Sequence, residues 1–464
     1  MTDSKIEKKE FLTGNLVWWF FTLLTIIYGI VLAFMEHGGG AFRVIIDGLW
    51  TIYSSPAVLV HDYFALAGIG PALINSGMAG ILILCAFKIA KLPVGGSQMG
   101  TMGLVMGFAF LGKNPVNMLP ILVGAFLYSL YKKEPYKNHV TVAGFATCLA
   151  PIVNQTVHIP QIVNVIGVTG AIILGAILGL FIGFIVNSMG TFIRKSHEGL
   201  NLYNIGWGAG LIAIAFAAVY NTIGLDRFGP GSSVPGVTIM SVHGMTGYYN
   251  VELLFYLGLT AVFFFLMGLL SGGSSGYKLK EILYMKADDN HFYAKYGRGP
   301  TYIAMGFLTL VAIVFSLVFK IHLDAPIMGA IISMIGWGGF GKAVVNSVNL
   351  IIGVMLGGLV RYLLSLVLAP GLYPETPVLL YMSTHSTIWS SAFWSTCLSP
   401  MAKNFGWKWA LLVGMAHFMF ASTVAQFTWG MNLYNNGLAA GFVCVIMIPL
   451  IRAFDRKGKY PALM

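Results

Sequence analysis

Charged residues are scarce in this chain. Asp, Glu, Lys and Arg make up only 9% of its 464 residues, whereas a soluble domain carries about 25%. Most of them stand in short connections between apolar runs, and no polar stretch is long enough to bury the core of an aqueous domain. The composition therefore excludes a soluble globular protein.

The chain also lacks the motifs of metal, nucleotide and nucleic-acid sites. Its four cysteines lie in apolar stretches without metal-ligand spacing, and it has no Walker-type phosphate loop or zinc-protease motif. We therefore predict no disulfide framework, no metal, no cofactor and no catalytic residue. The net charge of +11 is explained by membrane orientation, so we predict no nucleic-acid partner.

Apolar residues and glycines are abundant instead, with 57% hydrophobic residues and 57 glycines. Apolar runs of about 18 residues or more recur, and each is long enough to cross a bilayer as a helix. Glycines on the faces of such helices let them pack closely. We predict an all-α integral membrane protein whose partner is the lipid bilayer.

Two parts of the chain repeat one another in the same order. The repeated blocks include Gly112-Lys113, which matches Gly341-Lys342. The order of the blocks predicts two copies of one unit, repeat one at 70–221 and repeat two at 299–451. The blocks are residues 70–127 with 299–356, ATCLAP (146–151) with STCLSP (395–400), and NLYN (201–204) with NLYN (432–435).

Each repeat shows six apolar segments, and one more apolar helix lies between the repeats. An odd number of crossings therefore separates a residue from its twin, so we predict inverted repeats, an architecture common in transporters. With a helix before repeat one, the total is about 14 transmembrane helices. The other parts are 1–69 (N-terminal helix plus a re-entrant or interfacial segment at 45–67), 222–298 (outer loop, linker helix 251–270 and basic cytoplasmic loop) and 452–464 (basic cytoplasmic tail).

The orientation follows from the basic residues. If residues 45–67 do not cross, most of the 27 basic residues lie on one side, which should be cytoplasmic. We predict a multi-pass protein of the cell membrane with both termini in the cytoplasm. Lys113 and Lys342 follow short apolar segments, and we expect their amines to reach out to the membrane surface.

The repeated NLYN stretches are the main candidates for a functional site. In each repeat a glycine (Gly199 or Gly430) breaks the chain just before NLYN, which predicts a helix start at membrane depth near the midplane. Irregular backbone is tolerated there only against protein or a water-filled cavity. The stretch either lines a substrate pathway or clamps two helices by hydrogen bonds. The residues are Asn201, Tyr203 and Asn204, with Asn432, Tyr434 and Asn435 as their twins.

Other polar residues at membrane depth extend the predicted pathway. Asn117 and Asn346 lie one turn beyond the lysines and could face it. Thr147 and Thr396 either touch a substrate or bond to a backbone carbonyl of their own helix. His139 and His385 stand near matching points of the two repeats, where a structural role competes with a role in the pathway.

Acidic residues are missing from all the apolar segments of the repeats. An ion-coupled transporter usually needs such a carboxylate, whereas amides, hydroxyls and aromatic rings suit a small neutral solute. We therefore predict a channel or facilitator for a small uncharged polar solute, possible as a homo-oligomer. The alternatives are an ion-coupled secondary transporter, and a non-transporting scaffold or a membrane-embedded enzyme with His385 beside Thr384 and Ser386.

The architecture resembles that of the urea-transporter channels, which are also built from two inverted repeats. There, a half-helix with a Leu-Pro-x-x-Thr-x-Pro-Phe motif opens the last helix of each repeat, and residues 200–204 and 431–435 stand in a similar place here, without the prolines and the threonine. The resemblance implies that these residues line a selectivity region. The whole chain also resembles an uncharacterised bacterial family of multi-pass membrane proteins.

Overall fold

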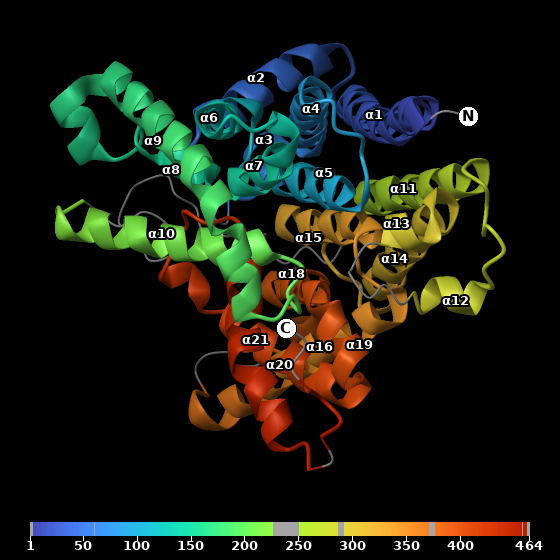
Figure 1. Ribbon diagram of the computed structural model, residues 1–464. Helices are drawn as coiled ribbons and strands as arrows, with labels where there is room; N and C mark the ends of the chain where they lie inside the picture. Colours follow the sequence, from blue (N-terminus) through green and yellow to red (C-terminus); the bar gives the residue numbers. More distant parts are fainter. Residues whose placement is uncertain are drawn as a thin grey trace. The chain divides into compact units, whose positions relative to one another are not determined.

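The structure is a computed structural model that describes residues 3–59, 61–225, 250–285, 292–370, 376–456 and 458–461. All regular elements in these residues are helical (Figure 1). Much of the predicted outer loop, residues 226–249, lies outside the described residues, as do parts of the predicted basic loop and tail. The chain forms two compact units, each built from three separate stretches of sequence.

Unit 1 comprises Met1–Thr191, Gly208–His243 and Ala425–Asn435. In it α1 packs against α4, and α5 and α6 join at a turn that carries Lys113. Its helices are α1 (Asp3–His37), α2 (Ala41–Ser54), α3 (Tyr63–Ala67), α4 (Ile69–Ile89), α5 (Gly96–Phe108), α6 (Pro115–Lys132), α7 (Val140–Ala146), α8 (Ala150–Gln155), most of α9 (Pro160–Ser196) and most of α10 (Asn204–Thr222).

Unit 2 comprises Phe192–Trp207, Gly244–Val424 and Asn436–Met464. In it α11 packs against α14, and α15 and α16 join at a turn that carries Lys342. Its helices are α11 (Val251–Leu270), α12 (Leu279–Leu283), α13 (Phe292–Tyr296), α14 (Arg298–Val318), α15 (Ala325–Gly336), α16 (Val344–Leu368), α17 (Val378–Thr384), α18 (Ser386–Ser395), α19 (Ser399–Phe405), α20 (Trp407–Ala421) and most of α21 (Asn435–Ala453).

The order of elements recurs in the two units. In each, a five-residue helix (α3 or α13) ends at a glycine with positive φ, Gly68 at 90° or Gly297 at 80°, and a 21-residue helix follows. Glycine adopts this conformation without the steric cost that a Cβ would bring. The predicted linker helix is α11, which packs on α14 as α1 packs on α4 (Figure 1). The similarity of the units therefore begins before residues 70 and 299.

Nine helices in the described part of the chain are long and apolar enough to cross a membrane. This number indicates a membrane-spanning protein. Five of the segments that we counted as crossings are not among the nine. The segment before each lysine turn is short, with 13 residues in α5 and 12 in α15. The other three are α6 and the broken segments α7–α8 and α17–α19.

The two broken segments have a common cause. A 3-10 turn, Thr147–Leu149 in unit 1 and Thr396–Leu398 in unit 2, interrupts each helix. Pro151 and Pro400 follow these turns, and a proline can neither donate an N–H to the carbonyl four residues earlier nor fit beside it. The ATCLAP and STCLSP blocks are therefore breaks that the sequence analysis did not predict, and broken helices near the midplane stay a prediction.

The segment at 45–67 forms no continuous helix. It contains the end of α2 and all of α3, with non-helical backbone from Ser55 to Asp62 apart from the undescribed Val60. Residues on one face of α2 are exposed, including Phe42 at 69% and Trp50 at 72%. The break agrees with a segment that does not cross by itself, and the predicted interfacial position stays a prediction.

Glycine pairs bring helices together in both units. A Cβ on Gly183 of α9 would collide with the Ile121 carbonyl oxygen of α6, and a Cβ on Gly414 of α20 would lie 2.5 Å from the Leu350 carbonyl oxygen of α16. Both contacts are with backbone, which cannot move aside as a flexible side chain could. The glycines therefore serve close helix packing, as the sequence predicted.

Replacing these glycines by alanine should destabilise both units. We expect Gly183→Ala and Gly414→Ala each to cost about 1–3 kcal/mol, because the methyl group overpacks a backbone contact. The measurement is the thermal midpoint of the purified protein in detergent. Gly258 of α11 has open space around its Cα, so Gly258→Ala is the matched control and should leave the midpoint unchanged or slightly higher. Equal effects of all three substitutions would contradict the packing role.

Candidate functional site

A buried lysine lies in the turn between α5 and α6. The Lys113 side chain is fully buried, and its Nζ donates a hydrogen bond to the Tyr434 hydroxyl at 2.6 Å. The same Nζ lies 4.4 Å from the centre of the Tyr434 ring. The ring of Phe108, the last residue of α5, packs on that tyrosine with 4.6 Å between centroids. The amine is therefore held by a hydroxyl and two aromatic rings.

Unit 2 contains the same arrangement. Lys342 is fully buried, its Nζ donates to the Tyr203 hydroxyl at 2.6 Å, and it lies 4.6 Å from the centre of that ring. Trp337 and Trp394 pack edge-on against the tyrosine at 5.3 and 5.7 Å. Our prediction that both lysines reach out to the membrane surface is therefore wrong, because each amine has a tyrosine partner inside its unit.

Hydrogen bonds to backbone fix the tyrosine turns. In unit 1, the Tyr434 N–H donates to Asn432 Oδ1 at 3.0 Å and the Leu433 N–H donates to the Cys148 carbonyl at 2.9 Å. The twins in unit 2 are Tyr203 to Asn201 Oδ1 at 2.9 Å and Leu202 to the Cys397 carbonyl at 3.0 Å. Each NLYN turn is thus docked on the 3-10 break of the broken helix.

The docking exchanges the turns between the repeats. Lys113 and Cys148 belong to repeat one, but the turn that contacts them, residues 432–435, comes from repeat two. Conversely, the turn of repeat one at 201–204 contacts Lys342 and Cys397 of repeat two. Each unit is therefore completed by the NLYN turn of the other repeat.

The asparagines around these turns stabilise helix starts. Asn204 Oδ1, at the start of α10, hydrogen-bonds to His197 Nε2 at 2.8 Å. Asn435 Oδ1, at the start of α21, accepts from the Thr428 hydroxyl at 3.2 Å, and Asn201 Nδ2 donates to the Gly437 carbonyl at 3.1 Å. These bonds are what the clamp alternative predicted, while a pathway role for the same residues stays a prediction.

Asn117 and Asn346 differ, although they are twins. The Asn117 amide is engaged in the turn, because Nδ2 donates to the Gly112 carbonyl at 3.0 Å and Oδ1 accepts from the Asn114 N–H at 3.0 Å. Asn346 is half-buried in α16, where Ala343 replaces Asn114. Asn117 therefore caps the start of α6 together with Asn114 and shapes the Lys113 turn. Asn346 cannot form this pair, because Ala343 has no side-chain amide.

The threonines and histidines lie at four different places. The Thr147 hydroxyl donates to the Gly144 carbonyl at 2.7 Å, and the Thr396 hydroxyl to the Phe393 carbonyl at 2.6 Å, as the backbone alternative predicted. His139 lies 2.9 Å from Glu134 in the connection before α7. His385 precedes α18, with its ring 4.9 Å from Tyr381.

The electrostatics of the two lysines are unusual. In the part of the chain that the structure describes, no carboxylate lies within ion-pairing distance of either amine. Burying an ammonium without a counter-charge is costly, so such a lysine either loses its proton or attracts a negatively charged or strongly hydrogen-bonding group. No three His, Cys, Asp or Glu side chains among the described residues are close enough together to hold a metal ion.

The lysines are the site residues that the sequence analysis missed. Their signal was present, because Gly-Lys occurs at matching points of both repeats. A lysine beside an apolar segment usually extends to water, and the tyrosine partners are far away along the chain.

A double-mutant cycle tests the lysine–tyrosine pair. Tyr434→Phe should cost about 1–3 kcal/mol, because it leaves a buried amine without its acceptor. In a Lys113→Met background the same substitution should cost far less. The measurement is the thermal midpoint of the four proteins in detergent, and Lys342 with Tyr203 provides the matched cycle. Equal costs of Tyr434→Phe in both backgrounds would show that the pair contributes nothing.

Comparison with known proteins places the chain in a family. No curated protein and no solved structure gives a match, so the resemblance to the urea-transporter channels has no support from relatives. The family model that matches describes proteins of unknown function (DUF1576) and covers residues 42–222 and 274–453. Each matched range contains one repeat. Because the match spans most of the chain, the protein belongs to this family of unknown function, which agrees with the predicted uncharacterised family.

Proposed function

We propose that this protein is a channel or facilitator for a small uncharged polar solute in the cell membrane. The observation that carries the proposal is the duplicated lysine–tyrosine pair, buried in each unit of a membrane-spanning protein. Polar and ionisable groups at membrane depth are expensive and usually functional. Two such pairs, each at a helix break, supply hydrogen bonds along a pathway.

The proposed topology has about 14 crossings in two inverted repeats, with both termini in the cytoplasm. Short helices such as α5 and α15, and the broken segments after them, count as crossings in this arrangement. They resemble the discontinuous helices that form binding sites in transporters.

The solute class follows from the groups at the turns. Amides, phenol hydroxyls and amines surround the breaks, and the apolar segments of the repeats contain no carboxylate that could carry a cation. A neutral solute leaves no uncompensated charge in the bilayer. The second candidate is an ion-coupled transporter, which is favoured by the burial of Lys113 and Lys342 without a carboxylate partner among the described residues. Its uptake would depend on a proton gradient.

Solute flux into proteoliposomes tests the transport function. Tyr203→Phe and Tyr434→Phe should each slow the flux of small neutral solutes by about fivefold or more, since each removes one hydrogen-bonding group. Tyr131→Phe, on a tyrosine that is 71% exposed, is the matched control and should transport normally. Wild-type flux equal to that of empty liposomes across a panel of neutral solutes would refute the proposal, and flux only with a proton gradient would favour the alternative.

Cysteine labelling tests the inverted topology. In a cysteine-free background, we introduce Arg194→Cys and Lys403→Cys one at a time and add a membrane-impermeant thiol reagent. Neither cysteine should react in intact cells, and both should react when the reagent can reach the cytoplasmic face. Arg194 lies near the C-terminal end of α9 in repeat one, and Lys403 lies near the C-terminal end of α19 in repeat two. Reaction of the two positions from opposite sides would exclude the proposed arrangement.

A further inference from the structure

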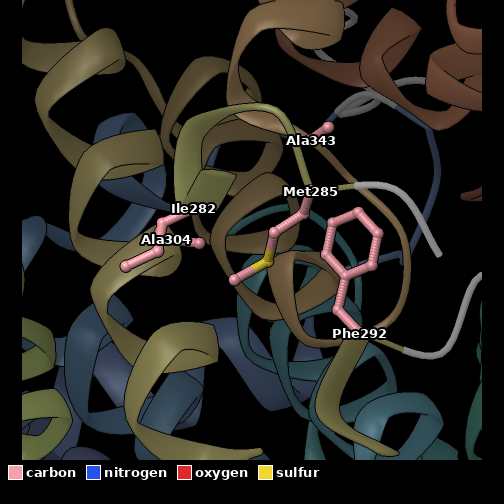
Figure 2. Close-up of a cluster of buried hydrophobic side chains, with 5 residues drawn as sticks. All are labelled: Ile282, Met285, Phe292, Ala304 and Ala343. Atoms are coloured by element: carbon pink, nitrogen blue, oxygen red, sulfur yellow. The ribbon is translucent and has the colours of Figure 1, made fainter. Parts of the chain in front are cut away.

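The two units differ at one place in their cores. In unit 2, the apolar cluster of Figure 2 contains Phe292, Ala304 and Ala343, packed together with Ile282 and Met285. The counterparts of Phe292, Ala304 and Ala343 in unit 1 are all polar. Tyr63 opens α3 as Phe292 opens α13, and the alignment of the repeats pairs Asn75 with Ala304 and Asn114 with Ala343. A dry cluster in one unit is therefore replaced by a hydroxyl and two amides in the other.

The three polar residues of unit 1 surround the Lys113 turn. Asn75 Nδ2 donates to the Ala109 carbonyl at 2.7 Å and to the Lys113 carbonyl at 2.9 Å. The Tyr63 N–H donates to the Phe110 carbonyl at 3.0 Å, and Asn114 itself ends the turn. All three are buried, with exposures of 0% for Tyr63 and Asn75 and 1% for Asn114.

Each of these side chains keeps one buried polar atom without a partner in the described part of the chain. The atoms are the Tyr63 hydroxyl, Asn75 Oδ1 and Asn114 Nδ2. The amide orientations are fixed by their other bonds. Both Asn75 N–H groups point at carbonyls, and Asn114 Oδ1 accepts from the Asn117 N–H at 2.9 Å. The turn therefore offers one acceptor, one donor and one hydroxyl.

Leaving such atoms unpaired is costly, about 1–3 kcal/mol for each group. Unit 2 shows that the fold does not require them, because apolar side chains fill the same place there. We propose that unit 1 holds a binding site at this turn for a small neutral molecule with adjacent donor and acceptor atoms. The molecule belongs to the class of primary amides.

A primary amide matches the unpaired atoms one by one. Its N–H donates to Asn75 Oδ1 while its carbonyl oxygen accepts from Asn114 Nδ2, and the Tyr63 hydroxyl adds a third bond. We assign a neutral ligand, since all three unpaired atoms belong to uncharged groups and the Lys113 amine already has Tyr434 as its partner. The site lies in one unit only, and it stands whether or not the protein transports its ligand.

Acetamide-dependent thermal stability of the purified full-length protein tests this site. A ligand that binds the folded state raises the thermal midpoint, and at a fixed concentration a tighter ligand raises it more. Asn114→Ser keeps the helix cap, because serine is a good N-cap residue, but removes the amide donor. Ala343→Ser places the same residue at the twin position, where there is no amide to remove. We expect acetamide to raise the thermal midpoint of the wild type and of Ala343→Ser alike. Asn114→Ser should bind acetamide with an affinity that is weaker by about fivefold or more.

A second pair of variants tests the site independently, in case Asn114→Ser does not fold. Tyr63→Phe removes only the unpaired hydroxyl and should also weaken the acetamide response, whereas Phe292→Tyr in unit 2 should not. Acetone, which has the acceptor but no donor, should have little effect on any of the proteins. An identical acetamide response in wild type, Asn114→Ser and Tyr63→Phe would overturn the proposal. The proposal would also be overturned if the site holds only water. In that case acetamide would cause no shift of the thermal midpoint that depends on Asn114 and Tyr63.

Discussion

A lysine amine buried in an apolar core must have a hydrogen-bonding partner, and the rest of this structure depends on how that need is met. Lys113 is satisfied by Tyr434, and Lys342 by Tyr203, at the same distance of 2.6 Å. Both partners are the third residue of an NLYN turn. Because the tyrosine must reach the amine, the turn is fixed to the broken helix, and the helices that begin there, α10 and α21, start at a defined place.

The exchange of turns connects the two repeats more tightly than a linker would. Unit 1 needs residues 425–435, which lie near the end of the chain, and unit 2 needs residues 192–207 from the first repeat. Neither repeat can therefore complete a unit by itself. Contacts over such separations slow folding, because the loop must close before they form. In this arrangement each unit depends on residues from both repeats.

The fold was predictable where local chemistry decides it. Apolar runs indicated membrane helices, and the glycines marked close packing, but the helix breaks at ATCLAP and STCLSP were not predicted. The prediction for the environment of the lysines was wrong, because that environment is set by partners far away in the sequence. The difference between Asn75 and Ala304 was visible in the alignment of the repeats. Its meaning required the structure, which shows that Asn75 Oδ1 is buried and that Ala304 lies in an apolar cluster.

The exchange of turns is tested most directly by cross-linking with the native cysteines. The Leu433 N–H lies 2.9 Å from the Cys148 carbonyl oxygen, so the two backbones are neighbours. With Cys148 as the only native cysteine kept, Leu433→Cys should cross-link to it through a short thiol-reactive bridge. The two halves would then stay joined after proteolysis at a site introduced between the repeats. A cross-link from Cys148 to Leu202→Cys instead would show that each repeat keeps its own turn and would contradict the account.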